Sequence, residues 1–200
     1  MSSYDQIIYD VAKRNGYPDA SARLIVAQAR FESSDYSSNV FKNNFNTSGM
    51  KFVGQPLATR GTLAPSNERS SKCNAQSGWV CKNNDYYAKF KSVEDSAKDK
   101  IERLFNITRN GITPQDIKNA KTPTEFSTLQ KKRNYFGFGT WDSAEGQTQI
   151  RNYAAGLTRK LNKIQIVQYI KENPKKSGFV AIVVVGLVVY GIYTYKKLKK

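Results

Sequence analysis

The sequence contains no histidine among its 200 residues. Histidine is the side chain that most often serves as a general base and as a metal ligand. Its absence excludes Ser-His-Asp and Cys-His catalysis in their usual forms. Any acid–base chemistry in this chain must therefore use carboxylates, tyrosine or lysine.

Cysteine is nearly absent as well, since the chain has only Cys73 and Cys81. Two thiols without histidine cannot complete a four-ligand zinc site unless carboxylates are recruited, so we expect no metal and no cofactor. A local disulfide between the two cysteines and a pair of free thiols are both consistent with the sequence.

Acidic residues are scarce relative to basic ones, with 16 Asp and Glu against 32 Lys and Arg. Such an excess is typical of a solvated surface, and it also suits a protein that binds an anionic cell-wall polymer or nucleic acid. The basic residues are scattered along the chain instead of forming one stripe, so no nucleic-acid partner is expected.

The N-terminus lacks a basic segment followed by an apolar one, so it does not predict a signal peptide. The C-terminus is different, because residues 178–195 read GFVAIVVVGLVVYGIYTY without a charge. As a helix this run would span about 27 Å, close to the thickness of a bilayer core. A buried core helix is the alternative, but a core helix would hardly end in KKLKK. The pattern predicts a linker at 166–177, a transmembrane helix at 178–195 and a basic tail at 196–200.

Residues 1–165 show mainly helical signals. Apolar residues at 7, 8, 11 and 12 precede a stop signal at Asn15-Gly16, and a second helix is expected to begin near Pro18. Ser92 followed by Asp95 resembles a capping box. Further helices are expected after Thr113-Pro114 and after Thr122-Pro123, and a last one over 143–161.

Residues 52–90 carry several Gly and Pro and short β-prone pieces, at Trp79–Cys81 and at Tyr86-Tyr87. These features predict a β-hairpin lobe inserted between the helical parts. The predicted fold class is α+β and mainly α: a lysozyme-like helical domain over 1–165 with this small lobe, followed by the C-terminal transmembrane helix.

Glu32 is the candidate for acid catalysis. It ends an apolar helix and lies four positions after Gln28, so both side chains share one helical face, beside Phe31. An apolar cleft disfavours a charged carboxylate, so a glutamate in such a cleft could keep a proton and donate it to a leaving glycosidic oxygen. Taken alone, a solvated helix glutamate is the more common explanation.

Three ordered blocks of residues sharpen this interpretation. In the first block, Glu32-Ser33 and Ser38 are followed by an N-x-x-G-[IM]-K pattern at 46–51. The third block has Tyr135 with Gly137, Gly139 and Thr140, followed by Tyr153 and Leu157. The middle block consists of Tyr87, Phe90, Ser92, Asp95, Ser96 and Asp99. Together these blocks resemble the glucosaminidases of glycoside hydrolase family 73, over roughly residues 5–162.

The resemblance implies a lysozyme-like domain in which Glu32 is the general acid. It also implies that Asn46 shapes the floor of a glycan groove and that Tyr135 lines the opposite wall. Gln28 would contact the substrate. The family's Gly-Trp-Gly after Glu-Ser is Ser34-Asp35-Tyr36 here, so that Tyr36 would take over the stacking on a sugar.

A second catalytic carboxylate is harder to assign. The family places one in the hairpin lobe, and Glu68 is the only glutamate in residues 52–90, with Asp85 as the other acid there. A second carboxylate about 5–5.5 Å from Glu32 would imply a glycosyl or stabilised intermediate, and about 6.5–9.5 Å would imply inversion. Attack by the substrate's own N-acetyl group and lytic transglycosylation both stay open.

The function expected from the sequence is a membrane-anchored peptidoglycan hydrolase whose partners are glycan strands and, through residues 178–195, the lipid bilayer. The basic tail favours a cytoplasmic C-terminus, which would place residues 1–177 outside the cell. No signal peptide is predicted that would export them. A bacteriophage enzyme carried in a virion membrane would resolve the conflict, with other virion proteins as further partners; a host enzyme in the inner membrane is the alternative. A non-catalytic wall-binding or structural membrane protein is the non-enzymatic hypothesis.

Overall fold

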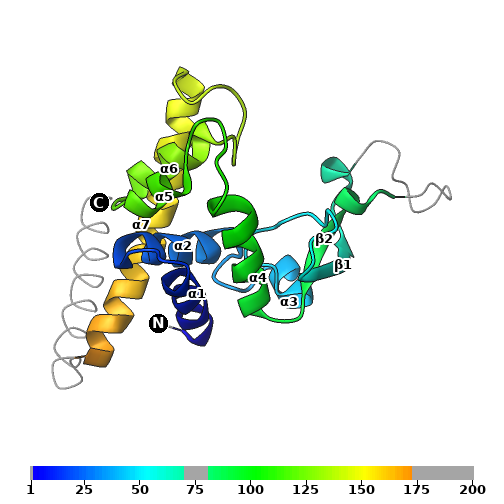
Figure 1. The fold of residues 1–200 in the computed structure, drawn as a ribbon, viewed down its shortest axis with the longest axis horizontal. Helices are drawn as coiled ribbons and strands as arrows, with labels where there is room; N and C mark the ends of the chain where they lie inside the picture. Colours follow the sequence, from blue (N-terminus) through cyan, green and yellow to red (C-terminus); the bar gives the residue numbers. More distant parts are fainter. Residues whose placement is uncertain (1, 70–80, 173–200) are drawn as a thin grey trace, which may run out of the picture. The chain divides into compact units, whose positions relative to one another are not determined.

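The computed structural model describes residues 2–69 and 81–172 (Figure 1). The chain divides into two compact units, Met1–Leu161 and Asn162–Lys200, and all of the candidate site residues lie in the first. The first unit combines helices with one two-stranded sheet.

Three of the helices begin where the sequence predicts a cap or a Thr-Pro start signal. The α1 helix (Ser3–Arg14) is capped by Ser2 and ends at Asn15, and α2 spans Asp19–Glu32. Ser92 caps α4 by accepting a hydrogen bond from the backbone N–H of Asp95. Capping boxes with proline at the first helical position open α5 and α6, as Thr-Pro pairs favour. The bounds are Val93–Lys100 for α4, Pro114–Asn119 for α5, Pro123–Lys132 for α6 and Ala144–Glu172 for α7.

The core forms where α1 packs against α2 and α4, and where α2 also meets α5 and α6. The α2 helix is the central element, because eight of its fourteen residues are buried. Its small residues, including Ala22, Ala27 and Ala29, let neighbouring helices approach closely. The other elements thus surround α2 and fix the position of its last residue, Glu32.

The hairpin lobe consists of β1 (Ala58–Leu63) and β2 (Tyr86–Phe90), paired antiparallel with an irregularity between Arg60 and Leu63 (Figure 1). On its other edge β2 forms a bridge between Tyr87 and Lys51. The predicted strand at Tyr86-Tyr87 is confirmed, while the piece at Trp79–Cys81 falls mostly outside the described residues. The β1 strand was not predicted.

A short helix, α3 (Asn39–Asn44), packs against both strands and was also not predicted. Asn44 bonds to Thr62 through both ends of its amide, over 2.8 and 3.1 Å. Glycine is required at position 61, because a Cβ there would lie 2.3 Å from the Asn44 side-chain oxygen. This close approach anchors the lobe to the helix that follows the Glu32 segment.

The α4 helix changes its winding at its end. Residues Ile101–Phe105 form a π-helix directly after Lys100. Short π segments are rare in proteins and occur frequently at functional sites.

The fold class requires a correction. Across 2–69 and 81–172, no helix is both long and apolar enough to cross a bilayer, and the predicted span at 178–195 lies outside these residues. The expected fold with a C-terminal transmembrane helix is therefore replaced by an α+β fold with one two-stranded sheet. The predicted single-pass membrane localisation is withdrawn with it. The linker at 166–177 and the tail at 196–200 fall partly or wholly outside the described residues.

Candidate active site

Glu32 is the last residue of α2, and the chain turns sharply behind it. Ser34, Asp35 and Tyr36 all adopt left-handed backbone conformations, with φ of 54°, 56° and 66°. Such a conformation costs roughly 1–2 kcal/mol for each residue with a side chain. None of these three residues is a glycine, the residue that adopts this conformation most readily.

Side chains compensate for the strain in this turn. Ser33 donates to the Ala29 carbonyl over 2.6 Å and accepts from the backbone N–H of Tyr36 over 3.0 Å. Asp35 forms ion pairs with Arg30 at 3.2 Å and with Lys160 at 2.7 Å. These contacts hold the segment after Glu32 in one conformation, and strained segments of this kind are concentrated at functional sites.

The Glu32 carboxylate is held by two tyrosine hydroxyls. Tyr135 donates to its Oε2 atom over 2.8 Å, and Tyr153 donates to its Oε1 atom over 2.6 Å. The Lys100 Nζ atom lies 3.6 Å from Oε2 as an ion-pair partner. Because the Glu32 side chain is only 14% exposed, these contacts fix the orientation of a nearly buried carboxylate.

The surroundings of Glu32 are thus polar as well as aromatic. Burial and the neighbouring Glu32 hold the pKa values of Tyr135 and Tyr153 well above their usual range. Both tyrosines consequently remain hydrogen-bond donors throughout the neutral and mildly alkaline range.

Aromatic packing fixes Tyr153. Its ring stacks on Phe136, with 4.2 Å between centroids, and meets Phe31 edge-on at 5.2 Å. Glycine at position 156 leaves room for Phe31, since a Cβ there would lie 2.4 Å from that ring. The α7 helix can therefore lie directly against the end of α2, with the Tyr153 hydroxyl at the carboxylate.

Gln28 and Asn46 are both buried and serve the site indirectly. Gln28 donates from Nε2 to the Tyr153 hydroxyl over 2.9 Å, one turn before Glu32. Asn46 donates to the carbonyls of Met50 and Ala88 and accepts from the backbone N–H groups of Ser48 and Met50, and so ties the 46–50 turn to β2. The substrate-binding roles predicted for these two residues stay predictions.

Tyr36 lies away from the Glu32 carboxylate cluster. Its hydroxyl donates to Asp5 over 2.8 Å, and its ring packs against Tyr4 and Phe41. These contacts use the hydroxyl and part of the ring for packing between α1 and α3. The stacking of Tyr36 on a sugar remains a prediction without a contact that favours it.

Glu68 belongs to a separate cluster in the hairpin lobe. Its Oε2 atom accepts from Lys51 at 2.7 Å and from the Tyr87 hydroxyl at 2.8 Å. The hydrogen bonds from Lys51 and Tyr87 hold the pKa of Glu68 below its usual value. Glu68 is therefore ionised at neutral pH, and its side chain is 43% exposed and so accessible to water. Asp85, the other acid of the lobe, is buried and accepts from the Lys82 backbone N–H.

Two members of the Glu32 cluster had no predicted role. Lys100 carries no motif signal, and it was one lysine among many in a basic chain. Tyr153 appeared only as a late position of the third sequence block. Tyr153 lies four positions before Leu157, so both share one helical face. This spacing is the one sequence signal that could have placed Tyr153 against the core.

No metal site is evident in the described part of the chain, which has no group of three or more Cys, Asp and Glu side chains placed to hold an ion. The sequence left a disulfide and free thiols both open; Cys81 is disulfide-bonded, and Cys73 lies outside the described residues.

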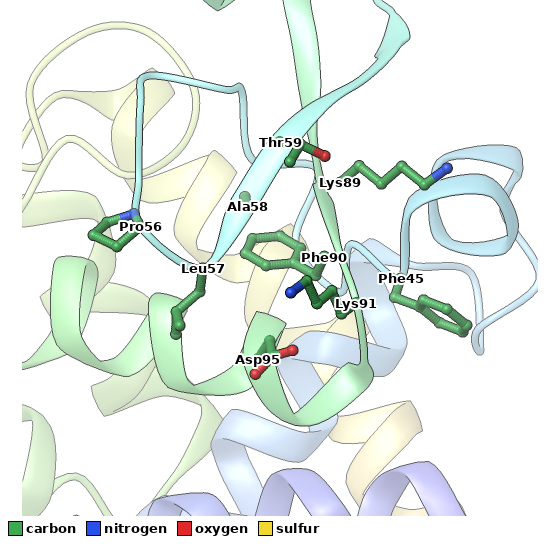
Figure 2. Close-up of a pocket in the computed structure, with 9 residues that line it drawn as sticks. All are labelled: Phe45, Pro56, Leu57, Ala58, Thr59, Lys89, Phe90, Lys91 and Asp95. Carbon is green, nitrogen blue, oxygen red and sulfur yellow. The ribbon is translucent and has the colours of Figure 1, made fainter.

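A pocket of about 620 Å³ lies at the base of the hairpin (Figure 2). Figure 2 shows Leu57, Phe90 and Asp95 around it, at the start of β1, the end of β2 and the first turn of α4. None of the predicted site residues lines this pocket. It is distinct from the Glu32 cluster.

No protein-family model matches the sequence, and no curated protein is detectably similar to it. Among solved structures, the catalytic domain of the autolysin Auto from Listeria monocytogenes is similar, with 20% identity, 84% of this chain and 89% of that chain covered, and a TM-score of 0.48. A type VI secretion system effector-immunity complex from Pseudomonas protegens contains a chain with 16% identity, coverage of 80% and 90%, and a TM-score of 0.49. Similarities of this size do not define the activity of this chain.

Neither the structure nor these comparisons support the expected lipid and virion partners.

Proposed function

We propose that this chain cleaves glycosidic bonds in the glycan strands of peptidoglycan, with Glu32 as the proton donor. The observation that carries the proposal is the Glu32 carboxyl group, which is nearly buried and is held at both oxygens by Tyr135 and Tyr153. The ordered sequence blocks that resemble glucosaminidases supply the substrate class. The chain has no histidine, which leaves a carboxyl group as the natural acid.

In the proposed reaction, protonated Glu32 transfers its proton to the glycosidic oxygen while the C1–O bond breaks and the electron pair of that bond passes to the oxygen. The Glu32 carboxylate then accepts hydrogen bonds from the two tyrosine hydroxyls. Because hydrogen bonds to a charged acceptor are stronger than those to a neutral one, this stabilisation grows as the proton leaves. A water molecule forms the new bond to C1, and the proton that it releases restores the acid form of Glu32.

Replacing Tyr153 by Phe is expected to lower kcat/KM by about 10- to 100-fold, because a hydrogen bond to a charged group contributes about 1.5–3 kcal/mol. The change also removes the acceptor of the Gln28 amide. Turnover of purified cell-wall sacculi would measure the effect. The matched control is Tyr9→Phe, whose hydroxyl donates to Asp19 at the surface. Equal losses in both variants would contradict the assignment.

For the second group we propose Glu68, which is ionised and accessible to water. An anionic carboxylate can activate a water molecule or stabilise an oxocarbenium-like intermediate. Glu68→Gln is then expected to lower kcat/KM by about 100-fold or more, within the usual range for a lost acid–base group. Glu94→Gln, another exposed glutamate in ion pairs, is the control. Full activity of Glu68→Gln would leave the substrate's N-acetyl group as the alternative nucleophile.

Mass spectrometry of the released fragments tests the function itself. Fragments ending in reducing N-acetylglucosamine would support a glucosaminidase, and reducing N-acetylmuramic acid would indicate a muramidase. Anhydro ends would indicate lytic transglycosylation, in which Glu32 needs no second carboxylate. Binding of sacculi without release of any fragment would contradict catalysis and support the non-enzymatic wall-binding alternative.

A further inference from the structure

Lys100 occupies an unusual place for a lysine. Its side chain is 2% exposed, and a fully buried ammonium group is rare because removal from water is costly. Within the described residues its Nζ atom makes no hydrogen bond, and its close charged partner is Glu32 at 3.6 Å. The fold thus places this lysine directly beside the proposed acid.

The backbone around Lys100 is specialised as well. The π-helix Ile101–Phe105 begins immediately after it, at the end of α4. The buried Phe105 ring, at the end of this π-helix, has its centroid 5.7 Å from Nζ. Phe105 also packs against Phe126 and Tyr17. The rare backbone form and the aromatic contact together hold the ammonium group in place.

From this geometry we infer that Lys100 is a positioning residue that sets the charge state of Glu32 during catalysis. The inference deepens the proposed function and rests on it for the catalytic role. As the proton leaves Glu32, the adjacent ammonium group stabilises the carboxylate that forms.

The other groups at this point do not replace Lys100. Tyr135 and Tyr153 bind the same carboxylate but are neutral, since their pKa values are held well above the usual range. Asp99, next to Lys100 on α4, is a buried acid whose pKa is raised to about 6 by burial, and it cannot supply a positive charge. Burial also lowers the pKa of Lys100, an effect that Glu32 opposes, so the charges of the two residues depend on each other.

The first test follows the Glu32 carboxyl signal by carbon-13 NMR as pH is varied, in the wild type, Lys100→Met and Lys100→Arg. Methionine preserves much of the shape without the charge, and arginine keeps the charge. We expect the Glu32 titration to move to higher pH by about one unit or more in Lys100→Met, because an adjacent opposite charge typically changes a carboxyl titration by that amount. Lys100→Arg should stay close to the wild type. An unchanged midpoint in Lys100→Met would overturn the inference.

A reciprocal measurement covers the case in which Lys100→Met does not fold. In Glu32→Gln the Lys100 amine loses its anionic partner, so its side-chain NMR signal should titrate at lower pH than in the wild type. Identical titration of Lys100 in the two proteins would equally overturn the inference.

Activity separates this inference from the proposed function. If the proposed function holds, the alkaline limb of the pH–rate profile moves upward in Lys100→Met together with the NMR midpoint. If the wild type releases no fragments but the Glu32 titration differs between the wild type and Lys100→Met, the proposed function is disproved and the ion pair is retained. If the wild type is active but neither the NMR midpoint nor the pH–rate profile changes in Lys100→Met, only the role of Lys100 is disproved.

Discussion

Replacing Glu32 by Gln is expected to lower kcat/KM for peptidoglycan cleavage by at least about 1,000-fold, within the usual contribution of a general acid. Glutamine has nearly the same shape, but its amide oxygen can accept at only one of the two positions that Tyr135 and Tyr153 bind, and it has no proton of suitable acidity to transfer. Residual activity would then come from substrate binding and orientation alone. Release of soluble fragments from sacculi, followed over time, measures the loss.

Folding must be monitored in this variant because Lys100 loses its charged partner. A buried ammonium group without a counterion is destabilising, so part of any loss could come from unfolding. Thermal unfolding of Glu32→Gln, compared with the assay temperature, separates the two causes. Glu145→Gln is the matched control, since Glu145 is an exposed glutamate that bonds only to Gln149 among the described residues. Clearing at the wild-type rate by a folded Glu32→Gln protein would remove Glu32 from the mechanism.

The helices α4, α5 and α6 were predictable because their starts are defined by local chemistry. Ser92, Thr113 and Thr122 each accept a hydrogen bond from a backbone N–H three residues later. Such caps need only the sequence within one turn, together with the apolar spacing that follows. Local sequence signals also predicted that Glu32 ends its helix, as it does in α2.

The partners of Glu32 could not be predicted in the same way. Tyr135 and Tyr153 are 103 and 121 positions away in the chain, and Lys100 comes from another helix altogether. Only the packing of α4 and α7 around α2 brings these residues together. The resemblance to a family indicated Tyr135, but it said nothing of Lys100.

The turn at 34–36 illustrates the limit of residue preferences. Ser, Asp and Tyr do not favour left-handed conformations as glycine does, so the sequence does not predict this turn. The structure has three left-handed residues in a row, supported by Ser33, Arg30 and Lys160. Tertiary contacts of this kind override local preference, and the sequence alone does not reveal them.

The strand β1 was missed for a related reason. Its sequence ATRGTL has neither strict apolar alternation nor aromatic residues. It forms because β2 supplies the pairing and because Gly61 lets Asn44 of α3 approach. Strand formation here depends on its neighbours more than on its own residues.

Replacing Asp5 by Ala is expected to reduce the free energy of unfolding by about 3–5 kcal/mol at neutral pH, because it breaks a buried ion pair and leaves the largely buried Arg30 with the longer ion pair to Asp35. Asp5 is completely buried and accepts from Arg30 through both carboxylate oxygens, at 2.8 and 2.7 Å. It also accepts from the Tyr36 hydroxyl and the Ser2 backbone N–H. Chemical denaturation followed by circular dichroism measures the change.

The effect should depend on pH in a defined direction. Burial alone would raise the pKa of Asp5, but the hydrogen bonds from Arg30, Ser2 and Tyr36 outweigh it and hold the pKa below its usual value. A carboxyl group with a lowered pKa stabilises the fold above its unfolded-state pKa of about 3.9 and loses that contribution as pH falls through the folded-state value. The difference in stability between wild type and Asp5→Ala should therefore be full at pH 7 and shrink at more acidic pH.

Two further variants test the Asp5–Arg30 ion pair. Asp10→Asn, on the same helix but bonded to Gln6 at the surface, is the control and should change stability by less than about 0.5 kcal/mol. In Asp5→Ala combined with Arg30→Met no charge is left unpaired, so the double variant should be more stable than Asp5→Ala alone. A double variant no more stable than the single one would show that Asp5 acts through Tyr36 and Ser2 instead.

Because Arg30 also binds Asp35 in the strained turn, loss of Asp5 should loosen the segment that follows Glu32, and activity should fall in Asp5→Ala even below its unfolding temperature.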